Sequence, residues 1–225
     1  MQSATSLSTL RLYQLVSPGL PVGAYNFSQG LEYAVHAGWV HDESSVLNWV
    51  QGVAQHSIGR LDVPLLIRMQ SAWRIDDVST VRRWNAELMA SRESEELRAE
   101  ERHLGRSLAK VLHALDIDSA QPFIKDNTTY ASMFALATSR WNNSTCDTAN
   151  AFIWAWCENQ VLAALKLMSL GQTAGQRILN ELLQHIPAMV ETAMHIVDED
   201  IGAAAPRFSM ASAWHETQYS RLFRS

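Results

Sequence analysis

The sequence is short of the residues that mark several large classes of protein. Only two of its 225 residues are cysteine, Cys146 and Cys157, too few for the disulfide framework of a small secreted domain. Lys and Arg number 18 against 23 Asp and Glu, so the basic excess of a general nucleic-acid binder is missing. No apolar run approaches the roughly 18 residues that cross a membrane. The first residues lack the basic and apolar stretches of a secretory signal, so we expect a cytoplasmic protein without nucleic-acid or membrane partners.

Prolines and glycines are also few, six and ten, and they separate long stretches with helical periodicity. After Asp42, for example, Val46, Trp49, Val50 and Val53 fall at the i, i+3, i+4 and i+7 positions of one helix face. The alternation of apolar and polar residues that marks a half-buried strand is absent, and no repeat or long linker divides the chain. We therefore predict an all-α fold, a single domain over residues 1–225 built as a bundle of roughly eight to ten helices.

Capping residues and helix breakers predict where these helices begin and end. The expected starting signals are Asn26 with Gln29 as a capping box, Asp42, Asp62 followed by Pro64, Asp76 or Asp77, Asp147, and Thr173. Gly171 is expected to end the central, strongly apolar helix, and Pro187 to kink or end the next one. The charged residues between Glu95 and Arg106 are expected to face solvent, because opposite charges recur one helical turn apart.

A search for catalytic and metal-binding motifs finds little chemistry. Gly19 and Gly23 lack the lysine and the preceding strand of a phosphate-binding loop. Ser28 matches only the second half of a nucleophile elbow, which leaves a helical hydrolase as a remote alternative. The histidines never pair at i+3 or i+4, so a tight metal site is not expected. A nickel site that uses Asp198, Asp200 and a histidine stays open as a second alternative to a protein without its own metal.

Two segments near the ends of the chain are not explained by helix packing. The first, residues 15–32, contains two prolines and two glycines within seven residues. The second, residues 215–225, carries Tyr219, Leu222 and Phe223 at helical spacing beside two arginines. Aromatic and Arg side chains are enriched at the centres of protein interfaces. From these residues alone, docking on a partner and packing on its own chain are equally open for the second segment.

Together, the two segments resemble the UreF family of urease accessory proteins. The family motif L-P-V-G-x-[YF]-x-x-S-Q-G-L-E is present from Leu20 to Glu32. The charged run from Arg92 to Arg102 matches a second family stretch, with Ser91 in place of a cysteine. The ending H-E-T-Q-Y-S-R-L-F-R-S matches in full from His215 to Ser225, after Trp214 in place of a basic residue. The likeness covers nearly the whole chain.

The resemblance implies an all-α protein that forms a homodimer and catalyses no reaction itself. Members of the family bind UreD, also called UreH, and this pair recruits the GTPase UreG. The assembly docks on apo-urease and supports GTP-dependent nickel insertion, with the UreF subunit regulating or gating UreG. The resemblance also agrees with the motif search, so no cofactor and no resident metal are expected on this chain.

The resemblance further implies which parts of the chain bind partners. These are an N-terminal segment, about residues 1–25, and a C-terminal tail, about residues 207–225. The expected partner-binding residues are Tyr25, Lys166, Tyr219, Arg221, Leu222 and Phe223. We expect the tail to fold beside the loop from Pro18 to Tyr25, with Arg221 donating hydrogen bonds as a fork while Phe223 buries its ring. Snorkelling to the surface is the other explanation for Lys166, which lies in an apolar helix.

Overall fold

The computed structural model describes residues 6–225, and within them the chain forms ten α-helices and no strand. The helices are α1 Leu7–Val16, α2 Leu31–His36, α3 Glu43–Val53, α4 Val63–Arg74, α5 Val78–Ala90, α6 Glu95–Ala114, α7 Tyr130–Arg140, α8 Thr145–Leu167, α9 Gln172–His195 and α10 Pro206–His215. Shorter 3₁₀ turns are η1 Ala24–Asn26, η3 Asp118–Ile124 and η4 Asp198–Asp200, and η2 Ala54–Asp62 is a π-helix. The predicted all-α fold and the predicted number of helices are confirmed.

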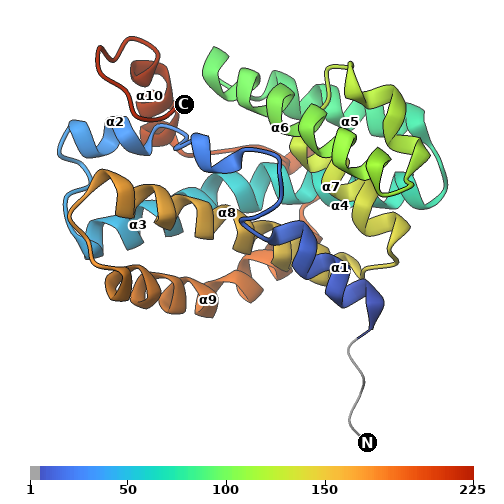
Figure 1. Ribbon diagram of the computed structural model, residues 1–225, viewed down its shortest axis with the longest axis horizontal. Helices are drawn as coiled ribbons and strands as arrows, with labels where there is room; N and C mark the ends of the chain where they lie inside the picture. The colour runs from blue at the N-terminus through green and yellow to red at the C-terminus, as the bar shows by residue number, and fades with distance from the viewer. Residues whose placement is uncertain (1–5) are drawn as a thin grey trace, which may run out of the picture.

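Helix α8 lies at the centre of the bundle and crosses the middle of the molecule in Figure 1. It packs against α9, α2, α4, α1 and α3. Its inward residues include Phe152, Ile153, Cys157 and Val161, all buried. The other half of the core forms where α4 packs on α7, with Trp73 closed off from solvent. Because α8 is apolar nearly all round its axis, burial at the centre is the arrangement that removes most of its surface from water.

The predicted helix starts at Asp42 and Asp77 are confirmed, since each carboxylate accepts a backbone N–H three residues on. Helix α4 begins at Val63 with Pro64 in its first turn, as expected, but Asp62 makes no capping hydrogen bond. There α3 continues through the π-helix η2 into α4, and the Asp62 side chain pairs with Arg92 instead of capping. The central helix begins at the N-cap Ser144, three residues before Asp147. Serine hydroxyls cap helices as well as carboxylates do, so the sequence does not decide between Ser144 and Asp147, one helical turn apart, as the first residue of α8.

Three further boundary predictions are wrong for reasons of tertiary structure. Gly171 precedes α9 as its N-cap, because α8 already ends at Leu167. Helix α9 runs through Pro187 to His195, so the expected end at this proline is wrong, whereas the expected kink stays a prediction. The proline is exposed, and its buried neighbours hold the helix on the core. Asn26 forms no capping box, since α2 begins only after Gly30 and the Gln29 amide bonds to residues far along the chain.

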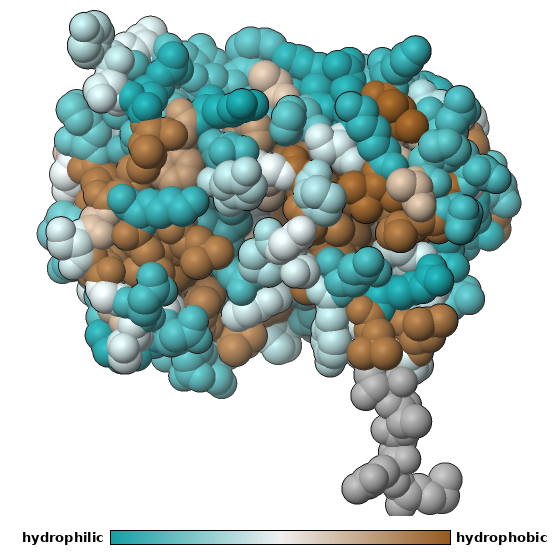
Figure 2. Space-filling model, viewed as in Figure 1, coloured by the Kyte–Doolittle hydropathy of each residue, from teal (hydrophilic) through white to brown (hydrophobic). Residues whose placement is uncertain are grey.

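The surface is mixed, with apolar side chains gathered in patches that polar side chains separate (Figure 2). Leu7, Leu10 and Tyr13 of α1 are among the exposed large apolar residues. Among residues 6–225, no helix combines the length and the apolar character that crossing a membrane requires.

Candidate partner-binding site

The chain folds back after α10, over α2 and the start of α6 (Figure 1). Gly30 makes this approach possible: its φ is +78°, and a Cβ there would lie 2.7 Å from the backbone nitrogen of Ser212. The Ser212 hydroxyl shares a 2.6 Å hydrogen bond with Ser94, the N-cap of α6. The Glu216 carboxylate accepts the first amide of α6, at Glu95, at 2.6 Å. Residues 216–225, the terminal segment, therefore start from a fixed point.

Glu32 of α2 anchors the backbone of the terminal segment. Its carboxylate accepts the Leu222 N–H at 2.6 Å and the Phe223 N–H at 2.9 Å. Glu32 is itself buried, and hydrogen bonds to an ionised carboxylate are roughly twice as strong as neutral ones. The two amides fix the side-chain directions, so that Phe223 points inward at 6% exposed while Leu222 stays 66% exposed.

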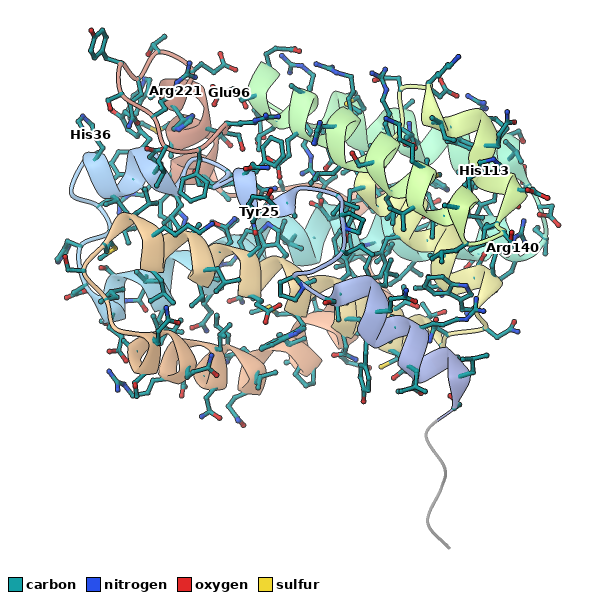
Figure 3. The ribbon with its side chains drawn as sticks, viewed as in Figure 1. Tyr25, His36, Glu96, His113, Arg140 and Arg221 are labelled. Carbon is teal, nitrogen blue, oxygen red and sulfur yellow. The ribbon has the colours of Figure 1, made fainter. Side chains whose placement is uncertain are left out.

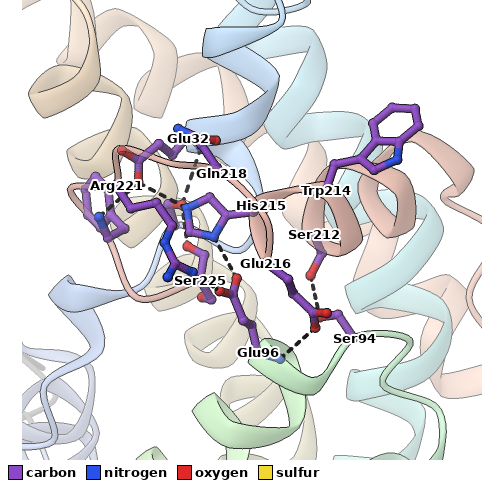
Figure 4. Close-up of polar contacts among 12 residues, drawn as sticks. Glu32, Ser94, Glu96, Ser212, Trp214, His215, Glu216, Gln218, Arg221 and Ser225 are labelled. Carbon is purple, nitrogen blue, oxygen red and sulfur yellow. Dashed lines mark hydrogen bonds and ion pairs between the residues drawn. The ribbon is translucent and has the colours of Figure 1, made fainter.

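His215, the last residue of α10, lies between two carboxylates and is completely buried (Figure 4). Its Nδ1 is 2.6 Å from Glu96 Oε2, and its Nε2 is 3.1 Å from Glu32 Oε2. The second Glu96 oxygen accepts a hydrogen bond from Arg221 Nη1 at 2.6 Å. Figure 3 shows Arg221 beside Glu96 at the end of the molecule where α10 lies. One polar network thus connects α2, α6, α10 and the terminal segment.

A second set of contacts holds the end of the terminal segment. The Ser225 carbonyl accepts the Ser28 N–H at 2.9 Å and the Ser28 hydroxyl at 2.5 Å. The Ser225 hydroxyl donates to Glu100 Oε2 at 2.8 Å, and the other Glu100 oxygen accepts from the Gln29 amide at 2.8 Å. Burial raises the pKa of Glu100 to about 7, although these two hydrogen bonds act in the opposite direction. The end of the segment thus covers a carboxyl group that titrates near neutrality.

Lys166 of α8 links the terminal segment to the loop before α2. Its Nζ lies 5.5 Å from the centre of the Tyr25 ring and 5.6 Å from the centre of the Phe223 ring. These distances are within the range of cation–π attraction. Tyr25 is 59% exposed, so one face of this aromatic pair is open to solvent. The ammonium therefore connects a buried ring of the terminal segment with an exposed ring of the loop.

The outer surface of this region carries apolar and aromatic side chains on an anchored backbone. Tyr219 is fully exposed, Leu222 and Tyr25 are more than half exposed, and Trp214, which packs against Tyr33 and Trp39, is 41% exposed. Side chains of these types dominate the centres of protein interfaces, and a backbone that is already ordered lowers the entropy lost on binding. We name Tyr25, Lys166, Trp214, Tyr219 and Leu222 the tail surface.

A charged cluster lies inside the bundle, beneath the loop of residues 17–25. The Arg92 guanidinium pairs with Asp62 and, at 3.0 Å from its Nε, with Glu101 Oε1. The other Glu101 oxygen accepts the Tyr130 N–H at 2.9 Å. A cavity of about 120 Å³ adjoins these groups, and Glu158 also lines it. Burial raises the pKa of Asp62 and of Glu158.

Comparison with known proteins agrees with this architecture. The UreF family model matches residues 40–183, more than half of the chain. The urease accessory protein UreF of Alkalilimnicola ehrlichii is 46% identical over 220 residues, which cover 97% of this chain and 96% of that protein. UreF of Hahella chejuensis is 42% identical (97% of this chain, 99% of that protein), and UreF 2 of Brucella anthropi is 46% identical (98% and 97%). The chain belongs to the UreF family of urease accessory proteins.

The structure brings most of the residues singled out by the UreF resemblance into one region. Tyr25, Lys166 and Phe223 meet around the Lys166 ammonium, and Leu222 flanks them. Arg221 donates through Nη1 to Glu96, so the expected fork is wrong; its guanidinium is partly exposed and meets one oxygen. Tyr219 lies on the terminal segment with its side chain in solvent. Residues 1–5 of the expected N-terminal binding segment lie outside the described residues, and the partner-binding role of both end segments stays a prediction.

Sequence reasoning missed the residues that hold the terminal segment in this UreF protein. The charged side chains of residues 95–106 were expected to face solvent, yet Glu100 and Glu101 are buried and Glu96 contacts His215. Glu100 and Glu101 lie three and four residues after Leu97, on the buried face of α6. What the sequence does not show is their partners, which include Ser225 and Gln29 far along the chain and Arg92 in the preceding loop. A further signal was Glu32, the one charged residue of the motif from Leu20 to Glu32.

The residues of the two alternative readings have other partners. Ser28 is completely buried, and its hydroxyl donates to the Ser225 carbonyl. Asp198 pairs with Arg68 at 2.9 Å. Within residues 6–225, no three His, Cys, Asp or Glu side chains converge as a metal site would require. The carboxylates of Glu96 and Glu32 contact different ring nitrogens of His215, on opposite sides of the ring, so the three side chains do not surround a single position that a metal ion could take.

Proposed function

We propose that this UreF protein is a non-enzymatic scaffold for urease maturation in the cytoplasm. In this role it forms a complex with UreD and the GTPase UreG, and the complex supports GTP-dependent nickel insertion into apo-urease. The chain itself is proposed to act as a homodimer and to regulate or gate UreG. Family membership supports the urease context, and the tail surface supports a mode of action through protein contacts.

The tail surface is the proposed binding site for a protein partner. The supporting observation is that Glu32 fixes two successive amides, so Leu222 is held outward while Phe223 anchors the segment. A large apolar side chain held in solvent gains stability by burial, at about 25 cal/mol per Å² of apolar area. Tyr25 and Lys166 extend the same surface across the loop and α8.

Partner capture by surface variants tests the proposal. Tagged wild type, Leu222→Ala and Tyr219→Ala are compared for co-purification of UreD and UreG from a lysate that contains both. Because both side chains point away from the fold, the variants are expected to keep the wild-type unfolding midpoint. Retention of UreD is expected to fall at least about fivefold, since truncation at an interface centre costs more than about 1 kcal/mol.

Ile75→Ala is the matched control, because Ile75 is 76% exposed but lies at the end of α4, outside the tail surface. It is expected to capture partners as the wild type does. Wild-type capture by both tail variants would refute the assignment of this surface. Urease activation in cells that carry each variant as the sole copy then reports whether lost capture also abolishes maturation.

A further inference from the structure

A second cavity, of about 220 Å³, lies between the π-helix η2 and α9. We propose that this cavity binds a small oxyanion of the phosphate type, which Arg60 of η2 holds together with His56 and His185. The cavity shares no residue with the tail surface, so the site goes beyond the proposed function.

The polar side chains that line the cavity can all donate hydrogen bonds, and no carboxylate is among them. They belong to Gln51, Gln55, His56, Arg60, His185 and Thr192. Within residues 6–225, only the Thr192 hydroxyl among them has a hydrogen-bond partner on the protein, the Ala188 carbonyl at 2.9 Å. The chain as a whole carries more acidic than basic residues, 23 against 18, so a cavity lined by donors without an acid departs from its composition. These donors are available to an acceptor from outside the chain.

Arg60 is the strongest evidence for a ligand. Its side chain is partly buried, yet among residues 6–225 its guanidinium has no hydrogen bond, no ion pair and no aromatic ring beneath it. Every other partly buried arginine in the described part of the chain has one of these contacts: Arg11 lies over the Trp141 ring, and the rest donate to oxygen atoms, namely Arg68, Arg98, Arg102, Arg106 and Arg140. A guanidinium withdrawn from water without an acceptor costs free energy, which an anion in the cavity would recover.

The π-helix brings to one cavity donors that an α-helix would separate. Gln55 and Arg60 are five residues apart, which is about 1.4 turns of an α-helix, so they would lie on different sides of it. The i→i+5 hydrogen bonds of a π-helix widen the turn, and in η2 both residues line the cavity. π-helices are rare and occur frequently at functional sites. In η2, this rare geometry gathers donors around one space.

Neighbouring backbone holds η2 in this shape before any ligand binds. The Ala204 N–H donates to the His56 carbonyl at 2.8 Å, and the Gly202 N–H donates to the Arg60 carbonyl at 3.1 Å. The opposite wall of the cavity is the continuous helix α9, which packs on η2. Because the backbone on both sides is already ordered, binding loses little conformational entropy there.

Gly59 leaves space between the two helices. It is buried and lines the cavity, and a Cβ at this position would lie 3.9 Å from the Met189 Cβ on α9. A larger side chain would therefore take up room that a ligand needs. Glycine also lets a ligand approach the backbone closely.

The number and the charge of the donors select a phosphate-type anion. Arg60 can present two parallel N–H groups to two oxygens of one ligand, and His56 and His185 each add at least one donor. A carboxylate offers only two oxygens, whereas phosphate offers four, enough to engage these donors together. A cation does not fit, because no carboxylate lines the cavity and the Arg60 charge repels it. Glu181 approaches His185 Nε2 only to 3.8 Å, beyond hydrogen-bond distance, and does not line the cavity.

Titration calorimetry of the full-length protein with inorganic phosphate, at pH 7 in a buffer without other oxyanions, tests the proposal. We expect saturable binding of one phosphate per chain with a Kd below about 1 mM. Phosphate is also expected to raise the midpoint of thermal unfolding, since it binds only the folded chain. Glycerol 3-phosphate is titrated in parallel: tighter binding than that of free phosphate would assign the site to the phosphoryl group of a larger molecule, and weaker binding to the free anion.

Two variants test the site, one by removing a donor and the other by filling the space. Arg60→Met removes the guanidinium, and binding at least about tenfold weaker is expected because a charge-assisted contact is lost. Ala188→Leu keeps every donor but fills the cavity from an exposed position of α9, and it is expected to weaken binding as much. Neither change touches the buried core, so the unfolding midpoints without phosphate are expected to match the wild type.

Arg177→Met is the matched control, because Arg177 is an exposed arginine of the same helix that pairs with Glu43 and does not line the cavity. It is expected to bind phosphate as the wild type does. Absence of saturable binding in the wild type would overturn the proposal, as would wild-type affinity in Arg60→Met or in Ala188→Leu. Equal losses in Arg60→Met and Arg177→Met would also overturn it, since they would show attraction by overall charge rather than binding in this cavity.

Discussion

Two buried clusters in this chain share one arrangement, a nitrogen-bearing side chain between two carboxylates, yet they differ in that central residue. Inside the bundle, Arg92 lies between Asp62 and Glu101. At the chain end, His215 lies between Glu32 and Glu96. The Arg92 guanidinium stays charged at every pH at which proteins fold, and its cluster lies inside the core. The His215 cluster instead joins the end of the chain to the bundle.

The elements that the two clusters join differ in the same way. Arg92 and its partners connect the π-helix η2 with α6, both held by the core on other faces. His215 and its partners hold a segment that has no helix of its own after α10. Loss of the interior cluster should thus affect global unfolding, while loss of the terminal cluster should affect a local opening.

The largest effect is expected when the interior cation is removed. Arg92→Met leaves the carboxylates of Asp62 and Glu101 buried without their cation, which typically costs about 3–5 kcal/mol of unfolding free energy. Urea denaturation at pH 7 measures it. Arg82→Met, which removes the solvent-exposed partner of Asp126, is the control and is expected to change stability by less than about 1 kcal/mol. A small change in unfolding free energy for Arg92→Met would mean that the interior cluster does not stabilise the fold.

The next largest effect is expected when α10 can no longer pack closely against α2. Gly30→Ala places a Cβ 2.7 Å from the Ser212 backbone nitrogen and strains a φ of +78°. We expect a loss of about 2–4 kcal/mol, with α10 and the terminal segment displaced together. Gly38→Ala is matched, since its φ is +73° with nothing within 4 Å of the added Cβ, and only the strain of about 1–2 kcal/mol is expected.

Denaturation gives the two free energies, and hydrogen exchange shows where the loss falls. Gly30→Ala is expected to expose the amides of residues 216–225, whereas Gly38→Ala is expected to leave them protected. Equal exchange in the two variants would show that the terminal cluster holds without close contact between α10 and α2.

The same contrast explains what the sequence could and could not predict. Helical periodicity and capping residues predicted the helices, as at Asp42 and Asp77, because these signals depend only on residues close together in the sequence. The resemblance led to Tyr25, Lys166 and Phe223, and the structure brings these three together. Helical spacing places Glu100 on the face of Leu97 and Leu104, whereas Glu95 lies on another face, but only a partner from the chain end explains why a carboxylate is buried there. The polar clusters therefore required the three-dimensional structure.

A smaller effect is expected from the carboxylate that anchors the terminal segment. Glu32→Gln keeps the shape but leaves one oxygen to serve the Leu222 N–H, the Phe223 N–H and His215. The loss should be about 1–3 kcal/mol, seen as faster exchange of the segment with an unchanged core. Glu43→Gln is the control, an exposed carboxylate paired with Arg177 far from α10. Unchanged exchange in Glu32→Gln would assign the anchoring to Phe223 burial alone.

The smallest effect is expected at Arg221, the residue that the sequence analysis expected to hold the terminal segment, and it is to be compared with the effect at Glu32. Arg221 is 39% exposed and donates to a single oxygen of Glu96, so solvent screens this pair. Arg221→Met is expected to raise the exchange of the terminal segment by less than fivefold, corresponding to at most about 1 kcal/mol. Its methylene stem is retained by the Met side chain, which isolates the charge from the packing. If Arg221→Met loosens the segment as much as Glu32→Gln does, the guanidinium is the main anchor. Both clusters would then depend on an arginine, and the difference between the two regions would disappear.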